Sequence, residues 1–221
     1  MKKYNFTAET AEKKKKRIKN IIAILENEYP NAHIVLNYRT PFELLVATVL
    51  SAQCTDERVN KVTEKLFKKY ITIEDYLKVP QEELERDIFS TGFFKSKASK
   101  IRETARILLE QYNGKIPGTM EELTKLPGVG RKTANVLLAN LFNVPGIVVD
   151  THVIRLSNRL GFVDTDNPEK IEFALYEIVP KNKWITLTYV FIEHGRKICN
   201  ARNPKCEQCA IQQYCKYYTE V

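Results

Sequence analysis

The sequence predicts an all-α protein, because helix-start signals recur along it and strand signals are scarce. The run TPFE at residues 40–43 combines an N-cap threonine, a proline at the first helical position and a capping-box glutamate. Thr119 is followed by a glutamate three residues later, and Asn167 is followed by a proline. We therefore expect helices to begin near residues 41, 120 and 168.

Further helices are predicted where apolar residues recur every three to four positions. The clearest of these segments are residues 18–25, 59–66, 98–109 and 136–141. Prolines and glycines are expected to end the helices, at Pro30, Pro80, Gly92, Gly114, Pro145, Gly161 and Pro180. The pattern indicates about ten short helices joined by brief links.

Composition indicates a folded intracellular protein with a polyanionic partner. The chain has 221 residues, 43% of them apolar, which excludes a disordered chain. No stretch has the roughly 18 uncharged apolar residues of a membrane helix, and the start lacks the apolar region of a signal peptide. The net charge is +8, to which residues 1–20 contribute +6. Residues 91–106 form a second basic patch, with five Lys or Arg against one Glu.

The junction at residues 126–130, Leu-Pro-Gly-Val-Gly, is the most informative between two predicted helices. Gly128 and Gly130 flank one apolar residue, so a tight turn can bring backbone N–H groups close to an anion. The N-terminus of the next helix adds partial positive charge. These features predict a phosphate site. It is not a Walker A loop, which would require glycine where Leu126 and Arg131 stand.

Lys132 suggests chemistry at this junction. It lies in the first turn of the second helix beside Arg131, and both the helix dipole and that neighbour favour the neutral, nucleophilic amine. A plain phosphate contact is the alternative role for Lys132, and the turn alone leaves both open.

Asp150 follows the apolar residues 146–149 and precedes a predicted helix. We expect it to end a buried extended segment and to cap that helix. A capping carboxylate is oriented and stays ionised, so the cap is compatible with a catalytic role. His152 is expected to be a structural or phosphate-contacting residue.

Four of the five cysteines lie within the last 23 residues, in the pattern C-x6-C-x2-C-x5-C. Tight clustering in a reducing compartment indicates a metal site rather than disulfides. Tetrahedral zinc and an iron-sulfur cubane both remain open on spacing alone. The four residues are Cys199, Cys206, Cys209 and Cys215.

The hairpin run, Asp150 and the cysteine tail together resemble endonuclease III, a family of DNA glycosylases with AP lyase activity in the helix-hairpin-helix superfamily. The resemblance implies two helical domains with a DNA-binding cleft between them. Residues 34–145 would form a six-helix barrel that contains the hairpin. Residues 1–33 and 146–221 would form the second domain, with a [4Fe-4S] cluster on the four cysteines.

The resemblance also implies roles for single residues. Lys132 would be the nucleophile and Asp150 its partner. Gln53 would enter the space left by a flipped nucleotide, and Phe93 would be the wedge between bases, at a position often aliphatic in the family. Cys54 is read as a small buried apolar group. The remaining contacts to DNA are assigned to Gly128, Gly130, Arg131 and His152.

The implied function is base excision repair of double-stranded DNA that contains damaged bases or abasic sites. The enzyme would remove oxidised or ring-saturated pyrimidines and cleave the abasic site by β-elimination through a lysine Schiff base. We expect a monomer that does not associate with a membrane. It would lie in the cytoplasm or nucleoid of a prokaryote or in the nucleus of a eukaryote. The alternatives are a mismatch glycosylase, a class that typically lacks the lysine, and a non-enzymatic DNA-binding module with a zinc staple.

Overall fold

The computed structural model describes residues 7–220, which form twelve α-helices, four 3-10 helices and no strand. The predicted all-α fold is therefore confirmed. Within these residues, no helix combines the length and apolar character that crossing a membrane requires.

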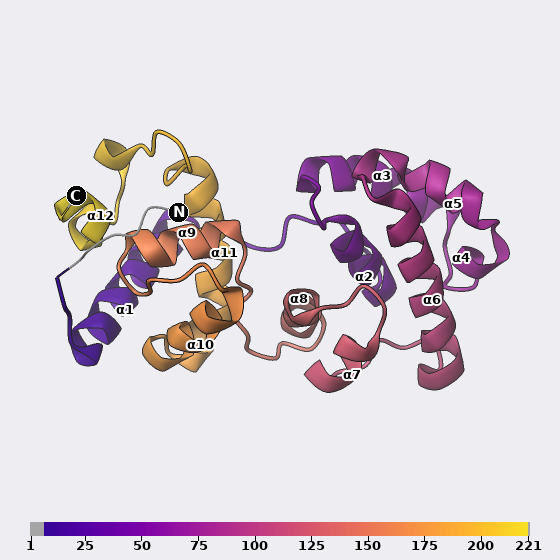
Figure 1. The fold of residues 1–221 in the computed structure, drawn as a ribbon, viewed down its shortest axis with the longest axis horizontal. Helices are drawn as coiled ribbons and strands as arrows, with labels where there is room; N and C mark the ends of the chain where they lie inside the picture. The colour runs from indigo at the N-terminus through magenta and orange to yellow at the C-terminus, as the bar shows by residue number, and fades with distance from the viewer. Residues whose placement is uncertain (1–6, 221) are drawn as a thin grey trace. The chain divides into compact units, whose positions relative to one another are not determined.

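The described chain divides into two compact units, one of residues 35–144 and one of residues 7–34 and 145–220. Figure 1 shows which helices belong to each. The first contains α2 (Pro41–Leu50), α3 (Asp56–Lys69), α4 (Asp75–Lys78), α5 (Gln81–Ile88), η1 (Phe89–Thr91), α6 (Phe94–Tyr112), α7 (Met120–Lys125) and α8 (Arg131–Leu141). The second contains α1 (Ala11–Glu28), α9 (Thr151–Arg159), α10 (Pro168–Ile178), η2 (Lys181–Lys183), α11 (Trp184–Lys197), η3 (Cys206–Gln208), η4 (Gln212–Tyr214) and α12 (Lys216–Thr219). The barrel architecture of the first unit stays a prediction.

The three predicted helix starts are confirmed, and each is capped as its sequence indicates. The Thr40 side chain accepts the Glu43 N–H at 3.1 Å, and α2 begins at Pro41. Thr119 accepts the N–H three residues later at 3.2 Å, and Asn167 does the same at 3.0 Å. These caps satisfy N–H groups that a helix start leaves without an intrahelical partner.

The core of the first unit is built around α2. Every residue of 42–50 is buried, and the helix packs against α3, α6 and α8. A helix that is apolar all round needs partners on all sides, which explains its central place. α6, the 19-residue helix of this unit, packs against α4 and α5 as well.

In the second unit α1 packs against α10 and α11, and α9 packs against α11 and α10. α1 contributes a buried stripe of Ile18, Ile21, Ile22 and Leu25 at helical spacing. The basic N-terminal segment is thus not a free arm from Ala11 onward. Arg17 donates to the backbone carbonyls of Leu160 at 2.7 Å and Tyr214 at 2.9 Å. Lys2 and Lys3 lie outside the described residues.

The basic patch at residues 91–106 is smaller than the sequence indicates. Lys97 is buried, and Arg102 donates to the carbonyls of Tyr76 at 2.7 Å and of Leu77 and Val79. Arg106 forms ion pairs with Glu103 and Glu110. Of the five basic residues, Lys95 and Lys100 are exposed without such a role in the fold. Charge counted along the sequence therefore overstates the positive surface of this segment.

Candidate active site and metal centre

A tight turn at residues 126–130 joins α7 to α8. The Val129 N–H donates to the Leu126 carbonyl at 3.0 Å, and the Val129 side chain is buried in the unit. Gly128 has φ +81°, and a Cβ there would lie 3.3 Å from two side-chain carbons of Lys100. Position 128 therefore requires glycine for both backbone conformation and space. At Gly130 the space that a Cβ would occupy is open.

Lys132 is the second residue of α8, and its side chain is exposed. Gly130 is the N-cap of this helix. The first-turn N–H groups of a helix and its dipole make this end a favourable place for an anion. An exposed lysine amine thus stands at the rim of a candidate phosphate site.

Asp150 caps α9, as the sequence predicted. One of its carboxylate oxygens, Oδ1, accepts the N–H groups of His152 and Val153, each at 2.9 Å. The preceding residues 147–149 are buried, and the Val148 N–H donates to the Thr188 hydroxyl at 3.0 Å. The backbone on both sides of Asp150 is therefore fixed, which orients its carboxylate.

The ring of His152 is held by α9 and α11. Arg155 Nη2 lies 2.9 Å from Nδ1 of His152, and since a guanidinium only donates, Nδ1 accepts and Nε2 carries the proton. Burial lowers the pKa of His152, which favours the neutral ring. A Cβ at Gly195 would lie 2.7 Å from Nδ1, so glycine at that position makes room for the imidazole.

Gln53 and Phe93 share an unusual backbone conformation. Five non-glycine residues of the described chain have positive φ, and three of these are asparagines, which adopt it readily. The other two are Gln53 (φ 54°) and Phe93 (φ 48°), each with an exposed side chain. Left-handed backbone at such residues is strained and is typical of functional sites.

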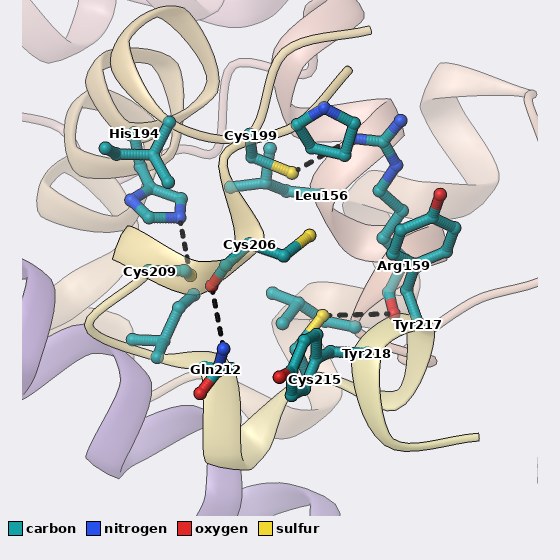
Figure 2. Close-up of a pocket in the computed structure, with 14 residues that line it drawn as sticks. Leu156, Arg159, His194, Cys199, Cys206, Cys209, Gln212, Cys215, Tyr217 and Tyr218 are labelled. Atoms are coloured by element: carbon teal, nitrogen blue, oxygen red, sulfur yellow. Dashed lines mark hydrogen bonds between the residues drawn. The ribbon is translucent and has the colours of Figure 1, made fainter. Parts of the chain in front are cut away.

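The four C-terminal cysteines line one pocket in the second unit and form no disulfide. Figure 2 shows their side chains around this pocket, with Arg159 of α9 and His194 of α11 on its wall. Among residues 7–220, no three His, Cys, Asp or Glu side chains are placed to hold a single metal ion. The cysteine pocket is hereafter the pocket lined by Cys199, Cys206, Cys209 and Cys215.

Side-chain nitrogen atoms face two of the sulfur atoms of the cysteine pocket. Arg159 Nη1 donates to Cys199 Sγ at 3.2 Å, and His194 Nε2 lies 3.4 Å from Cys209 Sγ (Figure 2). Tyr29 Oη lies 3.1 Å from the other ring nitrogen of His194. Burial lowers the pKa of His194 to about 4, so its ring is neutral near pH 7.

The donor set of the cysteine pocket fits a thiolate-bound cluster. Burial raises the pKa of the Cys209 thiol to about 12 and raises that of Cys215 as well, so buried thiolates here need a cationic partner. Backbone N–H groups of Ile211, Tyr217 and Tyr218 meet these two sulfurs. Iron-sulfur clusters are held by cysteine thiolates, commonly four of them, and hydrogen bonds to the sulfur atoms tune them.

Comparison with known proteins agrees with this geometry. Residues 46–181 match the family described as HhH-GPD superfamily base excision DNA repair protein. Endonuclease III of Synechocystis sp. is 47% identical over 203 residues, which cover 91% of this chain and 93% of that protein. A solved non-covalent endonuclease III–DNA complex is 47% identical, with a TM-score of 0.89 over 93% of this chain and 96% of that one. A trapped endonuclease III–DNA covalent intermediate gives the same identity and TM-score, over 93% of this chain and 97% of that one.

The chain belongs to the endonuclease III family. As a member of this family it is a base excision repair DNA glycosylase with AP lyase activity, which confirms the function that the sequence predicted. The non-enzymatic zinc-staple module is thereby set aside.

The predicted site residues of this endonuclease III family member fall in both units. Gln53, Phe93, the hairpin and Lys132 belong to the unit of residues 35–144. Asp150, His152 and the cysteine pocket belong to the other. The structure gathers the four cysteines around one pocket, while the roles assigned to the individual residues stay predictions.

Sequence reasoning missed three residues of these sites: Arg159, His194 and Lys97. Arg159 and His194 contact cysteines that are 40 and 15 residues away in the chain, so no local motif marks them. The sequence places Lys97 in the predicted basic patch of residues 91–106, whereas the structure buries it. Its position next to Ala98, in the buried stripe that continues with Ile101 and Leu108, was the available signal.

Proposed function

We propose that this enzyme removes oxidised or ring-saturated pyrimidines from double-stranded DNA and cleaves the abasic site by β-elimination, with Lys132 as the nucleophile. One observation carries the proposal: an exposed lysine at the N-terminus of α8, directly after a glycine hairpin turn. Its membership of the endonuclease III family supports the same assignment. Because its substrate is genomic DNA, the protein acts inside the cell.

DNA binding is proposed to rest on the hairpin and on neighbouring cations. The N–H groups around Gly128 and Gly130, with the α8 N-terminus and Arg131, contact phosphate without reading sequence. His152 donates from Nε2 to a second phosphate, because its Nδ1 is engaged by Arg155. A damaged nucleotide leaves the stack more easily than a sound one, since its pairing or stacking is already weakened.

Gln53 and Phe93 are proposed to stabilise the opened duplex. Phe93 inserts between bases as a wedge, and Gln53 enters the space left by the flipped nucleotide. Their exposed side chains and left-handed backbone support this assignment, because strained backbone of this kind is concentrated at functional sites.

The chemistry is a lysine-mediated elimination. The neutral Lys132 amine attacks C1′ of the deoxyribose, and the C1′–N bond to the base breaks with its electron pair leaving on the base. Asp150 accepts a proton from the resulting ammonium. Opening of the sugar ring at O4′ gives a Schiff base, which acidifies the C2′ proton. Loss of that proton expels the 3′ phosphate oxygen, and water then releases Lys132.

The cysteine pocket is proposed to hold a [4Fe-4S] cluster on its four thiolates. When bound, the cluster supplies covalent cross-links between distant chain segments, and neither glycosidic cleavage nor elimination needs an electron from it. The loop of residues 199–206 presents the exposed side chains of Arg202 and Lys205. We assign both to phosphate contacts. Yellow-brown protein with stoichiometric iron and sulfide is expected, and a colourless protein with stoichiometric zinc would contradict the assignment.

Borohydride trapping on an abasic duplex tests the nucleophile. The wild-type protein should form a covalent adduct with DNA, and Lys132→Gln should reduce trapping by at least about 1,000-fold. Lys125→Gln is the matched control, because Lys125 is an exposed lysine on α7 that pairs with Glu121. Trapping by Lys132→Gln at the wild-type level would show that another amine attacks.

Single-turnover excision rates on duplexes that differ in one lesion test the substrate class. Thymine glycol is expected to be removed fastest, ahead of an adenine or thymine that is normal but mispaired. The reverse order would favour a mismatch glycosylase. We also propose that the enzyme acts as a monomer. Light scattering on the protein as it elutes from a size-exclusion column measures its molar mass and checks this.

A further inference from the structure

Lys97 of α6 is a buried lysine whose side chain serves no surface role. Its exposed fraction is 4%, and its ammonium donates to two backbone carbonyls, those of Leu50 and Thr91, each at 2.8 Å. Burying an ammonium is unfavourable unless several partners compensate for lost water. Desolvation by burial accordingly lowers the pKa of Lys97. Such a residue calls for an explanation in terms of what it holds.

The two carbonyls that accept from Lys97 lie at the C-terminal ends of helical segments, where a positive charge is favourable. Leu50 is the last residue of α2, where the helix dipole places partial negative charge on the carbonyls. Thr91 is the last residue of η1, and its own hydroxyl donates back to Ile88 at 2.8 Å. Lys97 thus acts as a C-terminal cap for two helical segments that are far apart in sequence.

Each of these carbonyls also stands just before one of the two strained residues. Gln53 lies three residues after Leu50, and Phe93 lies two residues after Thr91. Both have left-handed backbone that persists only when the surrounding structure holds it. The Lys97 ammonium therefore links the backbone just before Gln53 to the backbone just before Phe93.

We propose that Lys97 is a positioning residue that locks the Gln53 and Phe93 segments in one common geometry for duplex opening. The proposal deepens the proposed function, because it rests on the assignment of Gln53 and Phe93 to the opened duplex. Lys97 itself touches neither DNA nor the reacting atoms. Its loss should impair the opening of a paired duplex and leave the chemistry at an already exposed sugar intact.

α6 supports the hairpin through different residues, which provides a contrast on the same helix. Thr104 donates its hydroxyl to the Pro127 carbonyl at 2.8 Å, and Lys100 packs beside Gly128. Lys100 lies about one turn after Lys97 on α6, and Thr104 lies about two turns after it. Because the hairpin is proposed to contact backbone phosphates in any DNA, Thr104 is expected to affect every DNA substrate, whereas Lys97 is expected to affect only the paired duplex.

The experiment compares two substrates for Lys97→Met, which keeps the length of the side chain and removes its charge and donors. Excision of a base lesion from a duplex should fall by about 10- to 100-fold, because misplaced groups lose orientation. Borohydride trapping at an abasic site in single-stranded DNA should stay within about 2-fold of wild type, since nothing needs to be opened there. Thr104→Val should reduce both reactions alike. Leu108→Ala, a buried α6 variant away from these segments, controls for lost stability.

A double-mutant cycle separates positioning from a general effect on folding. In a Gln53→Ala, Phe93→Ala background, Lys97→Met should change duplex excision by less than about 2-fold, because the side chains that it positions are gone. A full additional loss in that background would overturn the proposal. Equal loss on both substrates, or undiminished duplex excision, would do the same.

Lys97→Gln is measured in parallel, because glutamine still donates but reaches less far. It should lie between wild type and Lys97→Met in duplex excision. If neither variant folds, Lys97 is required by the fold alone and the proposal is wrong. Failure of the wild-type protein to trap on abasic DNA would overturn the proposed function instead, whatever the Lys97 variants do.

Discussion

The cysteine pocket and the segments of the other unit that carry Lys132, Gln53 and Phe93 are built in opposite ways. In the cysteine pocket the supporting side chains are enclosed: His194 is 1% exposed and Arg159 is 6% exposed, and both engage cysteine sulfur. In the unit of residues 35–144, Lys132 and Gln53 are exposed, and Phe93 is 65% exposed. One region resembles a core, and the other presents side chains outward from a core.

The difference separates groups that hold the fold from groups that we propose to contact DNA. Side chains of the cysteine pocket have many protein partners, so their loss should appear as lost stability. Exposed residues at turns have few, so their loss should appear in rates while the fold persists. Lys97 joins the two kinds, since it is enclosed like Arg159 but supports exposed residues.

The largest expected effect on the fold is in the cysteine pocket. With the proposed cluster in the pocket, Cys215→Ser removes one of its four thiolate ligands. Because binding of such a centre is coupled to folding, the free energy of unfolding should fall by about 5 kcal/mol or more. For a chain of this size that lowers the midpoint of thermal unfolding by at least about 10 °C. Circular dichroism melts and iron analysis measure both changes.

Cys54→Ser is the control for that variant, because Cys54 lies in the other unit and outside the cysteine pocket. It should retain full iron and a midpoint within about 2 °C of wild type. A Cys215→Ser protein that keeps both its iron and its midpoint would show that Cys215 holds neither the cluster nor the fold.

Local signals in the sequence were enough for the helix starts and for the turn that carries Lys132. A capping threonine, a proline at the first helical position and two glycines act through neighbours a few residues away, so Thr40 and Gly128 have the roles that their contexts predict. The same holds for Asp150, whose cap bonds reach only two and three residues ahead.

What the sequence could not predict depends on partners far along the chain. Arg102 and Lys97 have the composition of a basic surface, yet backbone carbonyls from α2 and from residues 76–91 draw their side chains inward. The left-handed backbone of Gln53 and Phe93 has no propensity signal, because neither residue type favours it. Only the packed unit determines these positions.

A smaller effect on stability is expected within the hairpin, at its two glycines. Gly128→Ala should cost about 1–2 kcal/mol of unfolding free energy, because φ is +81° and the new Cβ would press on Lys100 at 3.3 Å. Gly130→Ala should change stability by less than about 0.5 kcal/mol, because its Cβ would meet open space. Urea unfolding measures both.

Gly130→Ala, which should barely change stability, is expected to weaken DNA binding. If its backbone approaches phosphate closely, Gly130→Ala weakens binding by about 10-fold while its stability stays near wild type. Equal affinity of Gly130→Ala and wild type in a salt-matched titration would remove Gly130 from the DNA contacts.

A small effect on stability is expected for Asp150→Asn, at a position where a helix cap and the proposed catalytic carboxylate coincide. Asp150→Asn keeps an oxygen that can accept the N–H groups of His152 and Val153, since asparagine is as good an N-cap as aspartate. Its unfolding free energy should stay within about 0.5 kcal/mol of wild type, whereas Asp150→Ala loses the cap and about 1 kcal/mol.

Catalysis should not distinguish those two Asp150 variants. Both remove the negative charge that accepts a proton from Lys132 in the proposed mechanism, so both should slow single-turnover excision by about 100-fold or more. If Asp150→Asn excises at the wild-type rate and only Asp150→Ala is slow, the carboxylate acts through the cap alone. Asp150 would then belong with the residues that hold the fold, and its effect on excision would come from the position of α9 and not from proton transfer.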